Sequence, residues 1–218
     1  MALDDSQLEV YAGARRHEER AESYATKYDR ELHKRISSYF ERRAIRRALA
    51  VTGVRGATVL DVPCGAGRLT PLLLPVSRRL VSCDYSPAML AVYRRTHSAP
   101  CTVGSAFDLP FADRAFDVVF SARLSHHIAS DERRADYLRE IMRISRGWVI
   151  ATIFDRDSLK NRVREFSRRW SGKRSKHAFA RSDLERIAAS AGFAVAAGFP
   201  LSRLASGQVF YVLRRSGS

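Results

Sequence analysis

The sequence is poor in cysteine and has no long apolar run. Its three cysteines, Cys64, Cys83 and Cys101, show no CxxC spacing and no clustered histidines, so we expect neither a disulfide framework nor a metal site. No stretch approaches the roughly 18 apolar residues of a membrane-spanning helix, and the polar amino-terminal residues do not resemble a signal peptide. We therefore expect a cytoplasmic protein in a reducing compartment.

Acidic residues are scarce relative to basic ones. The chain has 38 lysines and arginines against 23 aspartates and glutamates, a formal net charge of +15. Such an excess is typical of proteins with a phosphate-rich partner, whether RNA, a charged membrane surface contacted peripherally or an anionic substrate. Arginines that simply coat exposed helices are the alternative explanation. Charge alone therefore does not identify the partner.

Short apolar runs alternate with helical stretches from Thr58 onward, which is the signature of βαβ units. We expect strands at TVLDV (58–62), RLVSCD (79–84), CTV (101–103), FDVVFSA (116–122), WVIATIF (148–154), FAVAAGF (193–199) and QVFYVLRR (208–215). The length of 218 residues suits one domain. The prediction is an α/β, Rossmann-like, seven-stranded and mostly parallel sheet with helices on both faces.

The residues before the first strand have a helical pattern. Leu32, Ile36, Tyr39, Phe40 and Leu49 fall near helical spacing in an arginine- and glutamate-rich stretch. We expect one or two amphipathic helices there, which form an N-terminal helical cap over residues 1–50, ahead of the main domain over residues 51–218.

Three serines are predicted to begin helices within the main domain. Ser86 is followed by a proline, and Ser130 by two acidic residues, as expected at helix starts. Ser182 with Glu185 fits a capping box, and Gly192 suits the end of that helix.

The segment 155–181 is polar and dense in arginine and lysine. It follows the fifth expected strand, at the sheet edge where ligands bind in open α/β folds. Arginines pair bidentately with phosphates, and an interleaved aromatic ring covers apolar groups. We therefore interpret the segment as a substrate-side insertion, with Arg168, Arg169 and Trp170 as acceptor contacts. A solvated amphipathic helix is the alternative.

The strongest motif is VLDVPCGAGRL (59–69), in which an expected strand ends at Asp61 and a helix is expected to begin near Arg68. Gly65 and Gly67 allow a ligand to approach the backbone. Glycine pairs of this kind are common in many sites. Asp61 argues against a dinucleotide ligand, because a carboxylate there would repel the pyrophosphate. It is compatible with S-adenosylmethionine, which carries an ammonium and a sulfonium. Asp84, ending the second strand, is then placed to bind ribose hydroxyls.

Four stretches resemble class I S-adenosylmethionine-dependent methyltransferases of the ubiquinone/menaquinone-biosynthesis type, methyltransferase type 11. They are VLDVPCGAGRL, VSCDYSPAML, VGSAFDLPFADRAFDVVFSA and LSHHI. The resemblance implies S-adenosyl-L-methionine as cofactor. It places Asp61 and the two loop glycines at the methionine end, Asp84 on the ribose, and Tyr85 and Met89 near the adenine. Cys64, in the glycine loop, and Ser121, at the end of the fourth strand, complete the predicted cofactor site.

Two positions depart from the family pattern. Members commonly have Gly-Asp-Ala where this chain has Gly104, Ser105 and Ala106. The missing carboxylate implies weaker cofactor affinity, with adenine recognition through backbone groups of Ala106 and Phe107. The second departure is Pro63. The resulting DVPCG form is similar to that of enzymes linked to cell-envelope saccharide modification.

Methyl transfer from a sulfonium needs alignment above all, and for an oxygen acceptor the removal of a proton. His126 and His127, after the fourth strand, are candidates for that base, and Arg123 in the same loop for holding an anionic substrate. Structural roles are the alternative for all three. Tyr11, Tyr24 and Tyr28 are candidates for closing over the cofactor, although each is better explained by packing.

The sequence therefore predicts a methyltransferase that acts on a small or lipid-linked anionic molecule, with an envelope saccharide intermediate as one candidate. An RNA methyltransferase is an alternative that the charge supports, although no NPPY-like motif follows the fourth strand. A non-catalytic basic binding protein on a degenerate methyltransferase fold is a third possibility.

Overall fold

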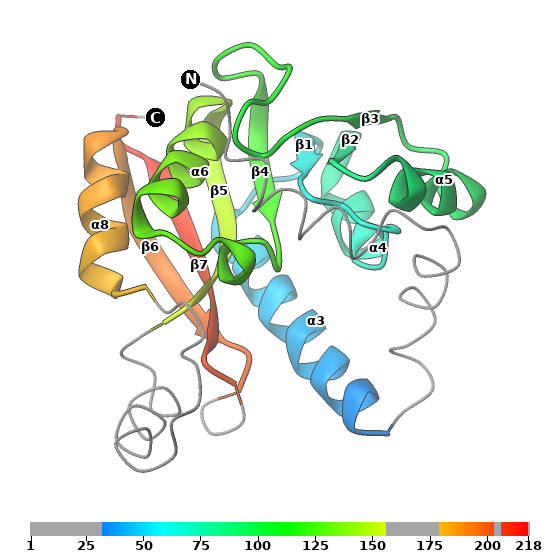
Figure 1. Ribbon diagram of the computed structural model, residues 1–218, viewed down its shortest axis with the longest axis horizontal. Coiled ribbons are helices and arrows are strands. Elements are labelled where there is room, and N and C mark those ends of the chain that lie inside the picture. The colour runs from blue at the N-terminus through cyan, green and yellow to red at the C-terminus, as the bar shows by residue number, and fades with distance from the viewer. Residues whose placement is uncertain (1–31, 156–178, 203–205, 218) are drawn as a thin grey trace.

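The computed structural model describes residues 32–155, 179–202 and 206–217. Its centre is a seven-stranded sheet in the order β3-β2-β1-β4-β5-β7-β6 (Figure 1). The strands are β1 (Ala57–Asp61), β2 (Ser77–Asp84), β3 (Cys101–Val103), β4 (Phe116–Ser121), β5 (Ser145–Phe154), β6 (Phe193–Pro200) and β7 (Gln208–Arg215). β7 pairs antiparallel with both β5 and β6, and the other pairings among the described strands are parallel. The predicted mostly parallel sheet is confirmed, with strand ends moved by up to three residues.

Helices cover both faces of this sheet, as predicted. They are α3 (Leu32–Thr52), α4 (Thr70–Leu73), α5 (Pro87–Thr96), α6 (Asp131–Arg143) and α8 (Arg181–Ser190), with short 3-10 turns η1 (Leu74–Val76) and η2 (Ser125–His127). Successive strand residues point to opposite faces. Leu60 and Val119 pack in the core with α6 and α8, whereas Val59 and Val118 pack in the core with α3 and α4.

Two of the three predicted serine caps are present. The Ser86 hydroxyl accepts from the Met89 N–H, and the Ser130 hydroxyl from the Arg133 N–H. The third prediction was wrong, because α8 begins at Arg181 with Ala180 as its cap. Ser182 therefore lies inside the helix, where its hydroxyl has no end to cap.

Two further helix predictions need correction. The helix after the glycine loop begins at Thr70, not near Arg68, and is only four residues long. In α3, Leu49 is buried as expected, but Ile36, Tyr39 and Phe40 are 51%, 61% and 41% exposed. The face of α3 that packs on the sheet is instead formed by smaller side chains and one charged residue: Glu41, Ala44, Ile45, Ala48 and Leu49.

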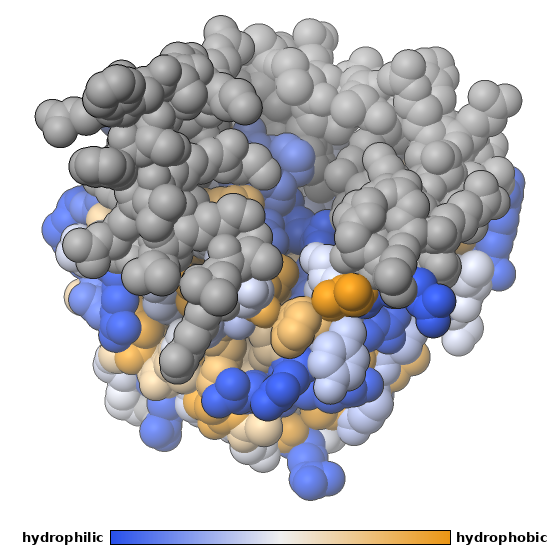
Figure 2. Space-filling model, turned by 90° about the horizontal axis from the view of Figure 1, so that it is seen from below, coloured by the Kyte–Doolittle hydropathy of each residue, from blue (hydrophilic) through white to orange (hydrophobic). Residues whose placement is uncertain are grey.

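The described surface on the underside of the molecule is of mixed character. Viewed from below, it shows hydrophobic side chains interleaved with hydrophilic ones (Figure 2). Within the described ranges, no helix is long and apolar enough to cross a membrane.

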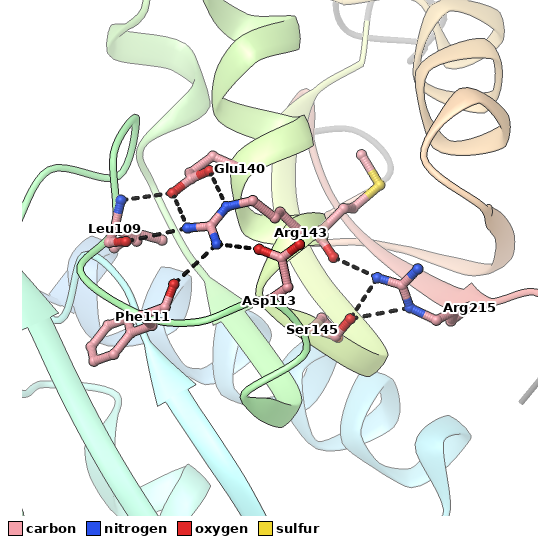
Figure 3. Close-up of polar contacts among 8 residues, drawn as sticks. Leu109, Phe111, Asp113, Glu140, Arg143, Ser145 and Arg215 are labelled. Carbon is pink, nitrogen blue, oxygen red and sulfur yellow. Dashed lines mark hydrogen bonds and ion pairs between the residues drawn. The ribbon is translucent and has the colours of Figure 1, made fainter.

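Arg143, at the end of α6, fixes the loop between β3 and β4 (Figure 3). Its guanidinium donates to the carbonyl oxygens of Leu109 and Phe111 at 3.2 and 3.0 Å, and to the carboxylates of Asp113 and Glu140 at 2.6 and 2.8 Å. These carboxylates hold the pKa of Arg143 above its usual range. One side chain thus connects α6 to the loop that contains Ser105 and Phe107.

We predict that Arg143→Ala lowers the free energy of unfolding by about 1–3 kcal/mol, because it leaves charged and carbonyl acceptors without their donor. The matched control is Arg139→Ala on the same helix, where the ion pair with Asp136 is 3.0 Å long and both side chains are at least half exposed. Such exposed pairs contribute only about 0.2–1 kcal/mol. Urea denaturation measures both. Equal losses for the two variants would contradict the role given to Arg143.

Candidate cofactor site

The glycine loop follows β1 and turns back on itself. Gly65 and Gly67 have φ of +55° and +82°, and the Gly67 N–H donates to the Cys64 carbonyl oxygen at 3.1 Å. A Cβ on Gly67 would lie 2.2 Å from Cδ2 of His97, whereas a Cβ on Gly65 would meet no atom of the described residues within 4 Å. Gly67 is therefore required by packing against the end of α5. Gly65 borders open space that a ligand can enter.

Asp84 holds this loop in place from the neighbouring strand. Its side chain lies at the end of β2 and is buried. One carboxylate oxygen accepts from the Gly65 N–H at 2.7 Å, and the other from the Ser86 N–H at 2.9 Å. Asp84 thus fixes both the glycine loop and the start of α5, a structural role that sequence reasoning missed. The predicted contact with a ribose stays a prediction.

Asp61, at the end of β1, is a buried acid whose carboxylate is incompletely satisfied. It is 2% exposed, and its Oδ2 has no hydrogen-bond partner among the described residues. Burial, and secondarily the charge of Asp84, raise the pKa of Asp61 to about 8. A buried acceptor without a donor, beside open space at Gly65, suits a ligand that brings a cationic N–H group.

The other predicted residues near the glycine loop lie at different depths. Met89 is 1% exposed and packs with Ala66 of the loop, while Tyr85 is half-buried. Cys64 is buried, and that burial raises its thiol pKa well above the usual range. A buried thiol with a raised pKa suits packing and not nucleophilic attack.

Ser105 stabilises its own turn. Its hydroxyl accepts from the Phe107 N–H at 3.2 Å, and its carbonyl oxygen accepts from the Asp108 N–H at 3.1 Å. Of the two backbone groups expected to recognise adenine, the Phe107 N–H is therefore engaged by Ser105. The prediction for Ala106, which is buried in the same turn, is unchanged.

Ser121 and the histidines lie around the end of β4. The Ser121 hydroxyl is buried and accepts from Tyr137 at 2.6 Å, while the buried Ser125 Oγ has no partner within the described part of the chain. In η2, His126 is half-buried and His127 exposed, with ring centroids 4.1 Å apart. The turn therefore brings the candidate bases to the same sheet edge as Asp61.

Arg123 has a protein partner that the sequence did not reveal. Its Nε donates to Oε1 of Glu41 at 2.6 Å, and Arg68, next to Gly67, donates to Oε2 of the same carboxylate at 2.7 Å. The predicted contact of Arg123 with an anionic substrate stays a prediction. Six other predicted site residues lie outside the described residues. They are the acceptor contacts Arg168, Arg169 and Trp170 and the candidate cofactor-covering residues Tyr11, Tyr24 and Tyr28.

A cavity of about 330 Å³ lies elsewhere, between α6 and α8. Its lining includes Asp131, Glu132, Asp183 and Arg186 but none of the predicted site residues. In the described ranges, no group of three or more histidine, cysteine or acidic side chains is arranged to hold a metal ion.

Comparisons with known proteins identify the class of this domain. Residues 60–150 match the family model described as a methyltransferase domain. The structure of magnesium protoporphyrin IX methyltransferase from Synechocystis, solved with bound S-adenosylmethionine, superimposes with a TM-score of 0.73 over 99% of both chains, at 14% identity. The fold is that of class I methyltransferases. Residues 60–150 are thus similar to a methyltransferase domain, and the family resemblance predicted from the four motifs is confirmed.

Sequence relatives share part of their length with this chain. A protein of Encephalitozoon cuniculi named as a methyltransferase is 31% identical over 127 residues, which cover 58% of each chain. The tRNA (carboxymethyluridine(34)-5-O)-methyltransferase alkbh8 of Xenopus tropicalis is 37% identical over 103 residues, or 46% of this chain and 15% of that protein. The chain thus spans little more than half of the first relative and less than a fifth of the second.

We predict that Asp61→Asn stabilises the ligand-free protein in a pH-dependent way. Because the folded-state pKa of Asp61 is about 8 against an ordinary value of 3.8, the folded protein retains a proton that the unfolded chain loses. The stability contributed by this group is complete below pH 3.8 and is lost as the pH rises through 8. Asp61→Asn should therefore raise the melting temperature clearly at pH 8, by an amount equivalent to about 1–3 kcal/mol, and little at pH 4. A difference that does not change with pH would contradict the raised pKa.

Proposed function

We propose that this chain binds S-adenosylmethionine at the ends of β1, β2 and β4 and transfers its methyl group to an anionic acceptor. The observation that carries the proposal is Asp61, a buried carboxylate whose Oδ2 lacks a donor among the described residues and whose loop borders open space at Gly65. The bound cofactor supplies an electrophilic methyl group on a sulfonium and an ammonium that suits Asp61.

The proposed roles of the protein groups follow from their places at this edge. Asp61 accepts from the cofactor ammonium, and Gly65 and Gly67 let the methionine end approach the backbone. Asp84 binds the ribose hydroxyls while it holds the glycine loop. Tyr85, Met89 and the turn at Ser105 and Ala106 surround the adenine. Cys64 and Ser121 line the cofactor by packing.

The histidines are proposed to act at the acceptor side. Methyl transfer consists of attack by an acceptor lone pair on the methyl carbon while the carbon–sulfur bond breaks. An oxygen acceptor must also lose a proton. His126 is held against His127 and Phe154, with ring centroids 4.1 and 5.2 Å away. One of these imidazoles is the proposed base for that proton, and Arg123 the proposed contact for the acceptor's negative charge.

The acceptor has two candidate classes. A small or lipid-linked anion, such as an envelope saccharide intermediate, agrees with the DVPCG motif. RNA is favoured by the net charge of +15 and by relatives named as tRNA methyltransferases, alkbh8 of Xenopus tropicalis and tRNA methyltransferase 9B of Mus musculus. We also propose a cytoplasmic protein in which residues 1–50 form a helical cap, residues 51–218 the main domain, and residues 155–181 an insertion at the acceptor side.

We predict that S-adenosylmethionine binds with release of a proton between pH 6 and 7.5. The cofactor ammonium favours the ionised form of Asp61, whose pKa is about 8 in the free protein, so affinity should rise with pH over this range. Calorimetric titration in two buffers of different ionisation enthalpy measures the number of protons released on binding.

The same titration includes two further ligands and two variants. S-adenosylhomocysteine should bind and NAD should not, and Asp61→Asn should weaken binding by at least about tenfold, or 1.4 kcal/mol. Asp117→Asn, at the amino-terminal end of β4 and so away from the proposed site, should leave affinity unchanged. Absence of binding by both adenosyl ligands would refute the proposed cofactor.

The acceptor classes separate by salt dependence. If the acceptor is RNA, transfer of a radiolabelled methyl group from S-adenosylmethionine to bulk tRNA should occur, and affinity for tRNA should fall by about 10³–10⁵ between 50 and 200 mM salt when 6–10 phosphates are contacted. A small anion should show a much flatter dependence. Transfer to a lipid or saccharide extract, with none to tRNA, would reject the RNA alternative.

A further inference from the structure

Glu41 is a completely buried carboxylate at the proposed cofactor edge, although it belongs to the helix before the first strand. It is the only acidic residue of α3, a helix that contains many arginines, and its side chain has no solvent exposure. Both of its oxygens are engaged. Oε1 accepts from Nε of Arg123 at 2.6 Å and Oε2 from Nη2 of Arg68 at 2.7 Å.

The two arginines come from the two loops that frame the site. Arg68 directly follows Gly67 in the loop after β1. Arg123 lies two positions beyond Ser121, in the loop after β4, with a φ of +66°. The Arg123 N–H donates to Oγ1 of Thr152 in β5 at 2.6 Å, which fixes its backbone at this unusual conformation. A single carboxylate thus connects α3 to the cofactor loop and to the loop that leads to the histidines.

The arrangement depends on the charge of Glu41. The side chains of Arg68 and Arg123 are only 13% and 21% exposed, so solvent screens their mutual repulsion poorly. The carboxylate is the common counter-charge that lets both guanidiniums approach one point. Without it, the two guanidiniums would lose the acceptor that they share in a partly buried position, and we expect their loops to separate.

We propose that Glu41 is a positioning residue for methyl transfer, which sets the glycine loop and the loop after β4 at a fixed separation. The proposal rests on the proposed function, since those loops face the donor and the acceptor respectively. Glu41 acts through Arg68 and Arg123. Its loss therefore changes the alignment of the two reactants more than it changes the affinity for either one.

The main test is Glu41→Gln in the full chain. The amide has the same shape but cannot accept from both arginines, so kcat should fall by on the order of 100-fold, as expected for a misplacement of about 1 Å. KM for S-adenosylmethionine should rise by less than about tenfold. Glu41→Asp retains the charge on a side chain one methylene shorter and should recover part of kcat.

Two comparisons separate positioning from general stability. Asp117→Asn is the matched control, because Asp117 also links strands through an arginine, Arg146, and accepts from the Thr58 N–H at 2.7 Å, but at the far edge of the sheet. It should lower the melting temperature without changing kcat or KM. The double variant Glu41→Gln/Arg68→Gln should be no slower than Glu41→Gln alone, because the two residues act as one unit.

Hydrogen exchange tests Glu41 independently of activity. Glu41→Gln should increase exchange in peptides that cover residues 62–69 and 121–125 together, even in a protein to which no cofactor binds. Unchanged exchange in both loops would overturn the proposal, as would a variant that loses stability but keeps kcat and KM. Failure of the wild type to bind S-adenosylmethionine would instead refute the proposed function. If Glu41→Gln does not fold, Arg68→Lys, which keeps the charge without the planar fork, provides the same measurements.

Discussion

The structure depends on the way two carboxylates are buried at the ends of adjacent parallel strands. Asp61 ends β1 and Asp84 ends β2, and both side chains are removed from solvent. When two carboxylates are buried near each other, each negative charge disfavours ionisation of the other. Asp84 receives the backbone donors of Gly65 and Ser86, whereas Asp61 Oδ2 receives none from the described residues. The fold thus satisfies one acid and leaves an oxygen of the other without a donor from the described residues, at a cost to the stability of the ligand-free protein.

Local pattern was enough to predict most of the fold. Strands buried on both faces appear in the sequence as short, mainly apolar runs, such as residues 116–121. The caps at Ser86 and Ser130 depend only on neighbouring residues. The cap at Ser182 failed for a related reason. Arg181 pairs with Glu185 at 2.8 Å within the first turn of α8, so the acid that suggested a capping box has another local partner.

Residues of the candidate site could be predicted only where they lie in a motif that directly follows a strand. Asp61, Gly65, Gly67 and Asp84 follow strand ends that the sequence marks clearly. The partnership of Glu41 with Arg123 joins residues 82 positions apart, and no local sequence pattern connects two residues at that separation. Likewise, the packing of α3 through Ala44 and Ala48 leaves Tyr39 and Phe40 exposed, because the sheet accommodates the narrow face of the helix.

Several arginines that contribute to the net charge of +15 have structural roles. Arg143 and Arg215 donate to main-chain carbonyl oxygens, and Arg134 is 1% exposed in α6. Arginine here replaces the shorter polar residues that usually stabilise loops and helix ends, since one guanidinium reaches several acceptors. Part of the excess charge therefore serves the fold. An acceptor must be inferred from arginines on the surface, such as Arg43 and Arg46 of α3, and not from the total.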